Sequence, residues 1–143
     1  MSQWRAKALE LFPDLRLKIQ DSETIGAFWI ELSSLIHHFY RDSGERGLGN
    51  QPTLIRNICL YAVWCKNSES HNVREATLIE FYEQIPRLAA RYRPPVYGKI
   101  IRDLVASIGR AEIEAAVKAA SAYMKPAESD KFLAEVARAE HER

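Results

Sequence analysis

One stretch of the sequence, residues 55–86, concentrates side chains that are capable of metal binding or catalysis. It holds both cysteines of the chain, one histidine and several glutamates, among them Cys59, Cys65, His71, Glu75, Glu80 and Glu83. Thiolates, imidazoles and carboxylates act as metal ligands, nucleophiles or general acids and bases when they converge on one point. The first question is therefore whether these spacings bring the side chains together.

The two cysteines do not have the spacing of a metal site. Six residues along a helix turn the Cys65 side chain roughly 120° away from that of Cys59. Zinc sites usually take two ligands from one turn of two to four residues. His71 follows in a connecting turn, where only the tertiary structure can bring it to a cysteine. We interpret both cysteines as reduced thiols inside an apolar helix, and we expect neither a metal nor a cofactor.

Other residues with catalytic potential also lack a convergent pattern. His37 and His38 point about 100° apart and lie outside the apolar stripe of their helix. The sequence contains no phosphate-binding loop, no His-Glu-x-x-His pair and no Gly-x-Ser-x-Gly elbow. The glycine-containing run at residues 41–51 has no preceding strand, so it predicts a flexible loop. We therefore expect no enzymatic activity.

Two charged groups are candidates for binding a partner. Glu80 and Glu83 share the face of their helix that is opposite to its apolar stripe, so they offer a surface to a basic partner. Arg91 and Arg93 belong to a basic cluster in which Tyr92 is available to stack on a nucleic-acid base. A solvated surface is the alternative interpretation of both groups. Nucleic acid is the less favoured partner, because a small basic patch alone is weak evidence for nucleic-acid binding.

Trp64 is a further candidate for partner binding. It lies on the side of its helix away from Leu54, Ile58 and Cys65. Either a neighbouring helix covers this side chain or it anchors a partner, since tryptophan is enriched among the residues that dominate interfaces.

Helices are expected to position these candidate residues. No segment shows the alternation of apolar and polar residues that is typical of a strand. Apolar periodicity, proline and glycine predict helices at about residues 3–12, 25–40, 52–66, 72–85, 95–108, 110–124 and from 126 onward. Asp21 and Ser22 are the expected N-cap of the second helix, and Asn72 with Glu75 forms the expected capping box of the fourth. Pro86 is expected to end or kink that fourth helix.

The sequence thus predicts one all-α domain over residues 1–143, with about six or seven helices. Short connections favour an antiparallel bundle or a short stack of helical hairpins. Hydrophobic residues make up 47% of the chain and charged residues 27%, and the formal net charge is +1. We find neither the apolar region of a signal peptide nor a run of about 20 apolar residues. We expect a soluble, cytoplasmic protein outside the membrane.

Two resemblances to known protein families add to this prediction. The sequence HNVREATLIEFYEQI at residues 71–85 resembles the second helix of a HEAT-type repeat, without a repeated period along the chain. The segments LFPDLRLKI, AFWIELSSLI, IRNICLYAVWC and IEFYEQIP resemble the successive signatures of a family of small uncharacterised bacterial proteins. The resemblance implies an all-α fold without an assigned activity. Such proteins resemble immunity or accessory proteins by analogy.

We therefore expect a non-enzymatic protein-interaction module, and its partner is not identified by the sequence. Two alternatives stay open: a nucleic-acid-binding domain, or an enzyme whose site forms only in three dimensions from His71, Glu75 and the arginines near Tyr92. The alanine-rich segments 111–123 and 132–140 also offer a surface for a homodimer, because small side chains permit close helix approach.

Overall fold

Helices make up nearly all of residues 1–43 and 52–142, which are the residues that the computed structural model describes. They are α1 (Gln3–Leu11), η1 (Pro13–Leu15), α2 (Arg16–Asp21), α3 (Ile25–Ser43), α4 (Pro52–Lys66), α5 (His71–Glu80), η3 (Tyr82–Ala90), α6 (Pro94–Ser107), α7 (Arg110–Ala120) and α8 (Pro126–His141). These residues contain no strand, so the prediction of an all-α fold is confirmed. The predicted loop at residues 41–51 begins too early, because α3 continues to Ser43, and its remainder at 44–51 lies outside the described part of the chain.

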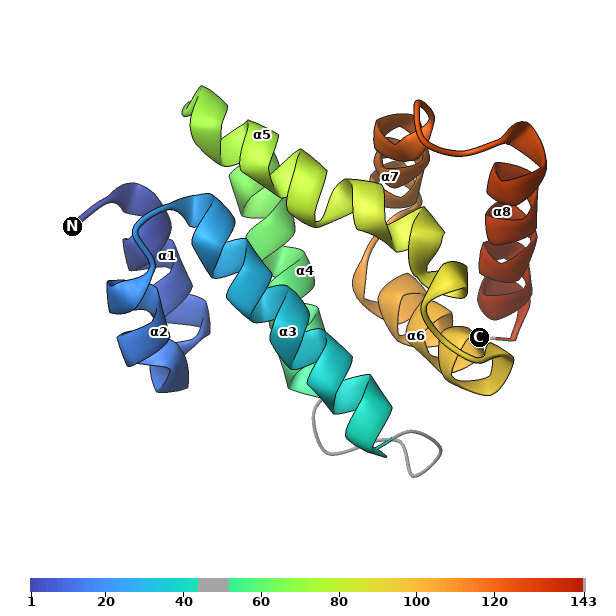
Figure 1. Cartoon of the computed structure of the whole chain (residues 1–143), viewed down its shortest axis with the longest axis horizontal. Helices are drawn as coiled ribbons and strands as arrows, with labels where there is room; N and C mark the ends of the chain where they lie inside the picture. Colours follow the sequence, from blue (N-terminus) through green and yellow to red (C-terminus); the bar gives the residue numbers. More distant parts are fainter. Residues whose placement is uncertain (44–51, 143) are drawn as a thin grey trace.

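The helices form one bundle around α4 (Figure 1). α3 and α5 pack against each other, and α4 contacts α1, α5 and α6. η3 continues the path of α5 and reaches α7, while α8 packs against α6. α4 is thus central, as the apolar residues around most of its circumference predict. No helix within the described residues has both the length and the hydrophobicity to cross a membrane.

The described residues contain more helices than the six or seven that we predicted, because eight α-helices are present along with η1 and η3. Pro13 ends the first helix as expected, but the chain then forms η1 and the short helix α2. α2 buries a single residue, Ile19. Six residues with one buried side chain do not create the apolar period that reveals a helix in a sequence.

The N-cap that we predicted for the second long helix is wrong. Asp21 is the last residue of α2, and the Ser22 hydroxyl donates to the Lys18 carbonyl oxygen at 2.7 Å. α3 begins at Ile25, where the Ala27 amide donates to Thr24 Oγ1 at 3.1 Å. The polar residues of this turn therefore serve two helix ends, which cannot be separated when α2 is not recognised.

The predicted capping box of the fourth long helix is also wrong, because the helix begins earlier. Ser70 is the N-cap, and its hydroxyl accepts a hydrogen bond from the Val73 amide at 3.3 Å. Asn72 lies inside the first turn, and Glu75 Oε2 lies 3.0 Å from His71 Nε2 instead of capping the helix. Serine and asparagine are both good caps, so the sequence alone does not choose between them.

Pro86 lies inside η3 and not at the end of an α-helix. α5 ends at Glu80, and Tyr82–Ala90 then adopts 3₁₀ geometry that accommodates the proline.

The predicted helix at 110–124 is shorter than expected, since α7 ends at Ala120. The alanines Ala116, Ala120 and Ala139 are buried within the chain, so part of the small-residue surface packs inside the monomer.

An aromatic cluster fills the space between α1, α3, α4 and α5. Trp29 and Tyr61 are fully buried with ring centroids 5.4 Å apart, and Phe28 packs edge-on against Tyr61 at 5.8 Å. Trp29 Nε1 donates to Thr77 Oγ1 at 2.9 Å, and the Tyr61 hydroxyl donates to the Trp4 carbonyl oxygen at 3.1 Å. The cluster therefore buries large rings and satisfies their polar atoms, which is the condition for tryptophan and tyrosine in a core.

Candidate functional site

The two cysteines are buried free thiols, as their sequence context predicted. Burial raises the pKa of Cys59 to about 12. Burial also raises the pKa of Cys65 to about 11, although hydrogen bonds from Thr77 and Tyr61 oppose the shift. Both groups are therefore protonated near pH 7, whereas nucleophilic or metal-binding cysteines act as thiolates.

His71 and Glu75 pair on the surface at the start of α5, where their side chains are 74% and 57% exposed. The arginines around Tyr92 follow η3, at the opposite end of the continuous α5 and η3 path (Figure 1). Across residues 1–43 and 52–142, no three His, Cys, Asp or Glu side chains gather in a way that could hold a metal ion.

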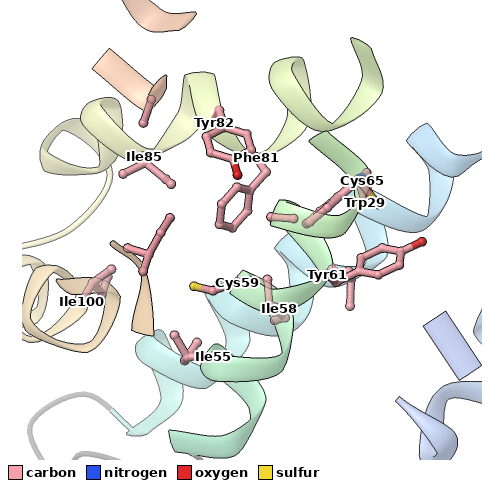
Figure 2. Packing of buried hydrophobic residues seen from close by; sticks show 14 of the residues in the cluster. Trp29, Ile55, Ile58, Cys59, Tyr61, Cys65, Phe81, Tyr82, Ile85 and Ile100 are labelled. Atoms are coloured by element: carbon pink, nitrogen blue, oxygen red, sulfur yellow. The ribbon is translucent and has the colours of Figure 1, made fainter. Parts of the chain in front are cut away.

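An apolar cleft of about 610 Å³ lies between α3, α4, the junction of α5 with η3, and α6. Phe81, Ile85 and Cys59 lie around the space between α4, η3 and α6 (Figure 2). Within the described residues, the lining consists of Ile30, Ser33, Ser34, Ile36, His37, Tyr40, Arg41, Ile55, Ile58, Cys59, Glu80, Phe81, Gln84, Ile85, Leu88, Arg91, Tyr92, Ile100 and Leu104. We did not predict this cleft from the sequence.

Helical periodicity explains how each segment contributes one wall. α4 supplies Ile55, Ile58 and Cys59, and α6 supplies Ile100 and Leu104, in both cases at the three- and four-residue spacing of a single helix face. The same spacing marks an ordinary core-facing stripe. In the sequence, a helix face that lines a cleft therefore has the same pattern as one that packs in a filled core. The tertiary arrangement is needed to distinguish the two.

Polar groups gather on part of the cleft lining. Tyr92 Oη and His37 Nδ1 share a hydrogen bond of 2.7 Å, and their rings pack at 5.4 Å between centroids. Burial raises the pKa of Tyr92, and the guanidinium groups of Arg91 and Arg41 oppose that shift. Both arginines line the same cleft as Tyr92. A tyrosine that we expected to be available for base stacking is thus partly buried against a histidine.

Tyr40, a second tyrosine on the cleft lining, forms a hydrogen bond with a residue of α6. The Tyr40 hydroxyl donates to Asp103 Oδ2 at 2.7 Å, and Lys99 Nζ lies 3.5 Å from the same carboxylate oxygen. Burial, followed by the hydrogen bond to Asp103, raises the pKa of Tyr40 well above its usual value. This tyrosine therefore stays neutral near pH 7 and holds α3 to α6.

The structure brings together two of the residues that we predicted to bind a partner. Glu80 and Arg91 both line the cleft, although η3 separates them in sequence. Glu80 is partly buried and Arg91 is exposed, and Arg91 Nη2 donates to Gln84 Oε1 at 2.8 Å. These residues and the exposed Ile30 place part of the lining at the protein surface.

The other three predicted binding residues do not line the cleft. Trp64 is partly buried, packs against the core and stacks on Tyr61 with an interplanar angle of 8°. Glu83 is partly buried in η3, and Arg93 is exposed at the N-cap of α6. The cleft therefore includes two of the five residues, Glu80 and Arg91.

A polar contact that we did not predict joins α4, η3 and α7. Glu112 accepts hydrogen bonds from the Tyr82 hydroxyl and from Lys66 Nζ, the latter at 2.7 Å. The Glu112 side chain is 16% exposed and that of Lys66 is 25% exposed, so water screens this pair less than a surface ion pair. Nothing in the local sequence pairs these residues, because they lie in three separate helices.

No family model matches the sequence, and neither a curated protein nor a solved structure matches it. The fold and the cleft thus define the class of this protein: an all-α bundle that contains an apolar cleft with basic groups on its lining.

Proposed function

We propose that this chain is a non-enzymatic protein-interaction module whose partner docks over the mouth of the cleft. The observation that carries the proposal is Ile30, which is 57% exposed and lines the same cleft as the charged side chains of Glu80 and Arg91. An apolar centre with a charged rim is the usual anatomy of a protein interface. An exposed aliphatic side chain at an apolar hollow gains most when a partner covers both.

The protonation states of Cys59 and Tyr40 support a binding function for the cleft and not a catalytic one. Burial raises the pKa of Cys59 to about 12 and also raises that of Tyr40. General bases and nucleophiles work best when their pKa lies near the operating pH or below it. Cys59 and Tyr40 are neutral at pH 7 and therefore suit a wall that contacts a partner.

The proposed partner is a cognate protein, in the manner of the small bacterial immunity or accessory proteins that the sequence resembles. The HEAT-like hairpin of this proposal is formed by α4 and α5, which pack against each other. The location that we propose is the cytoplasm, because free buried thiols suit a reducing compartment.

A photo-crosslinking experiment in the source cells tests the proposed interface. A benzophenone amino acid replaces Ile30 in one variant and Leu17 in a matched control, since Leu17 is 72% exposed on α2 and does not line the cleft. We expect one protein to crosslink from position 30 and not from position 17. Adding Glu80→Lys to the first variant reduces that crosslink, because it reverses the charge on the rim. Identical products from both positions would contradict the proposal.

A further inference from the structure

The size and lining of the cleft match those of a small-molecule site. Its volume of about 610 Å³ lies within the range of roughly 300–1,000 Å³ that is common for such sites. Ile55, Ile58, Phe81, Ile85, Ile100 and Leu104 supply apolar walls from three different helical segments. Walls of this kind gain dispersion contacts and release water when an aliphatic chain enters. A flexible hydrocarbon chain is therefore well matched to the interior.

The charged groups on the lining favour an anion. Arg41 comes from the last turns of α3 and Arg91 follows η3, and both line the cleft. Tyr92 lines the same cleft, and both guanidinium groups oppose the rise that burial causes in the pKa of its hydroxyl. In the part of the chain that the structure describes, neither arginine forms an ion pair with a carboxylate.

The acidic groups around the cleft do not cancel this positive charge. Among the lining residues that the structure describes, Glu80 is the one carboxylate, against the two guanidinium groups of Arg41 and Arg91. Asp103 approaches the wall behind Tyr40, but it accepts a hydrogen bond from that tyrosine and pairs with Lys99 at 3.5 Å. A cationic head group would therefore meet two positive charges, whereas a carboxylate can pair with a guanidinium in bidentate geometry.

We propose that the interior of the cleft binds an aliphatic carboxylate of the fatty-acid type, with its chain among the isoleucines and its carboxylate between Arg41 and Arg91. This ligand site goes beyond the proposed protein partner and does not depend on it. The two sites share the mouth of the cleft, so ligand and partner affect each other's affinity if both bind.

The test uses the full chain with labelled isoleucine δ1 methyl groups, titrated with dodecanoate and followed by NMR. We expect saturable shifts of the Ile58 and Ile85 methyl signals, because both side chains line the cleft. Ile19 and Ile113 are the internal controls, since they are buried in α2 and α7 away from it and keep their signals. These controls separate binding in the cleft from general loosening of the core.

Two probes of equal chain length and a matched set of variants test the head group. Dodecanoate binds about tenfold more tightly than dodecylamine, in keeping with charge-assisted pairing to arginine. The double variant Arg41→Gln, Arg91→Gln lowers the affinity for dodecanoate by about tenfold and leaves that for dodecanol nearly unchanged. Arg93→Gln is the matched control, because Arg93 is exposed near Arg91 and does not line the cleft. It binds dodecanoate like the wild type.

Three results would each overturn this proposal. They are equal affinities for dodecanoate and dodecylamine, shifts that include Ile19 and Ile113, and the lack of any saturable shift. Failure of the ligand site leaves the protein-partner proposal standing, since the crosslink from position 30 tests that proposal separately.

Discussion

The two faces of α4 build two different regions, an aromatic cluster and a cleft. Tyr61 is fully buried within the cluster, where it contacts the ring of Trp29. On the face toward η3 and α6, Ile58 and Cys59 are equally buried, yet they border a cleft of about 610 Å³. Large rings meet across the first gap, whereas α4 contributes two isoleucines and a thiol to the second, and these shorter side chains leave it open. Burial of a side chain is therefore not evidence that the space beside it is filled.

This comparison separates stability from binding. Most of the folding free energy from burial is expected in the aromatic cluster, because aromatic side chains bury the most area and make additional ring contacts. Binding is expected at the cleft, where a wall residue can change with a smaller loss of packing. Variants in the two regions should therefore differ in which property they alter.

The largest effect is expected for Trp29→Ala in the aromatic cluster. It removes a fully buried ring and the hydrogen-bond donor to Thr77, so the unfolding free energy falls by about 3–5 kcal/mol. Urea denaturation measures the loss, with Trp64→Ala as the control for a partly buried tryptophan. A loss for Trp29→Ala no greater than that for Trp64→Ala would contradict the proposed importance of the cluster.

The next effect is expected where η3 and α7 meet α4. Glu112→Gln removes the charge that pairs with the ammonium group of Lys66, whose side chain is only 25% exposed. We expect a loss of about 1–3 kcal/mol in urea denaturation, because a partly buried charge loses its partner. Glu10→Gln is the control, since Glu10 forms an exposed pair with Lys7. Equal effects of the two substitutions would show that the Glu112 contact is no stronger than a surface pair.

A smaller effect is expected from alkaline pH. Cys59 has a folded pKa of about 12, above the usual unfolded value of about 8.5, so its stabilising contribution is complete below the unfolded pKa. As pH rises from 8.5 toward 12, the unfolded state loses the thiol proton first, and the unfolding free energy decreases. Between pH 8 and pH 10 this thiol accounts for about 1–2 kcal/mol of loss.

Substitution of the cysteine isolates that contribution from the tyrosines, which also titrate at high pH. Cys59→Ala should lose less unfolding free energy than the wild type between pH 8 and pH 10 in urea denaturation. Identical slopes for the two proteins would show that the thiol does not titrate as its burial requires.

The smallest effect on stability is expected at the mouth of the cleft. Ile30→Ser changes a side chain that is 57% exposed, so the unfolding free energy should stay within about 0.5 kcal/mol of the wild type. The same substitution should weaken capture of the protein that crosslinks from position 30. A clear loss of stability without a loss of capture would assign Ile30 to the core.

Much of the fold could be predicted because long helices carry an apolar period. The stripe from Phe28 to Tyr40 gave α3, and the nearly continuous apolar surface of residues 54–65 gave the central α4. α2 and η3 were missed, since a six-residue helix and a proline-containing 3₁₀ segment lack that period.

The cleft could not be predicted, because its walls come from four segments that are distant in sequence. Arg41 and Arg91 meet at one hollow through tertiary packing, and no local pattern links them. Of the predicted binding residues, the exposed position of Glu80 on its helix was the useful signal. The alanine-rich surface for self-association stays a prediction, although part of it is buried inside the chain.

One measurement tests the division between cluster and cleft most directly: dodecanoate binding by Leu104→Phe, followed through the Ile58 and Ile85 methyl signals. Leu104 is partly buried and lines the cleft, so the larger ring occupies cleft volume without displacing a filled core. We predict that binding is lost while the unfolding free energy stays within about 1 kcal/mol of the wild type. Wild-type binding by this variant would contradict the account, since a ligand in the cleft cannot share that space with the ring.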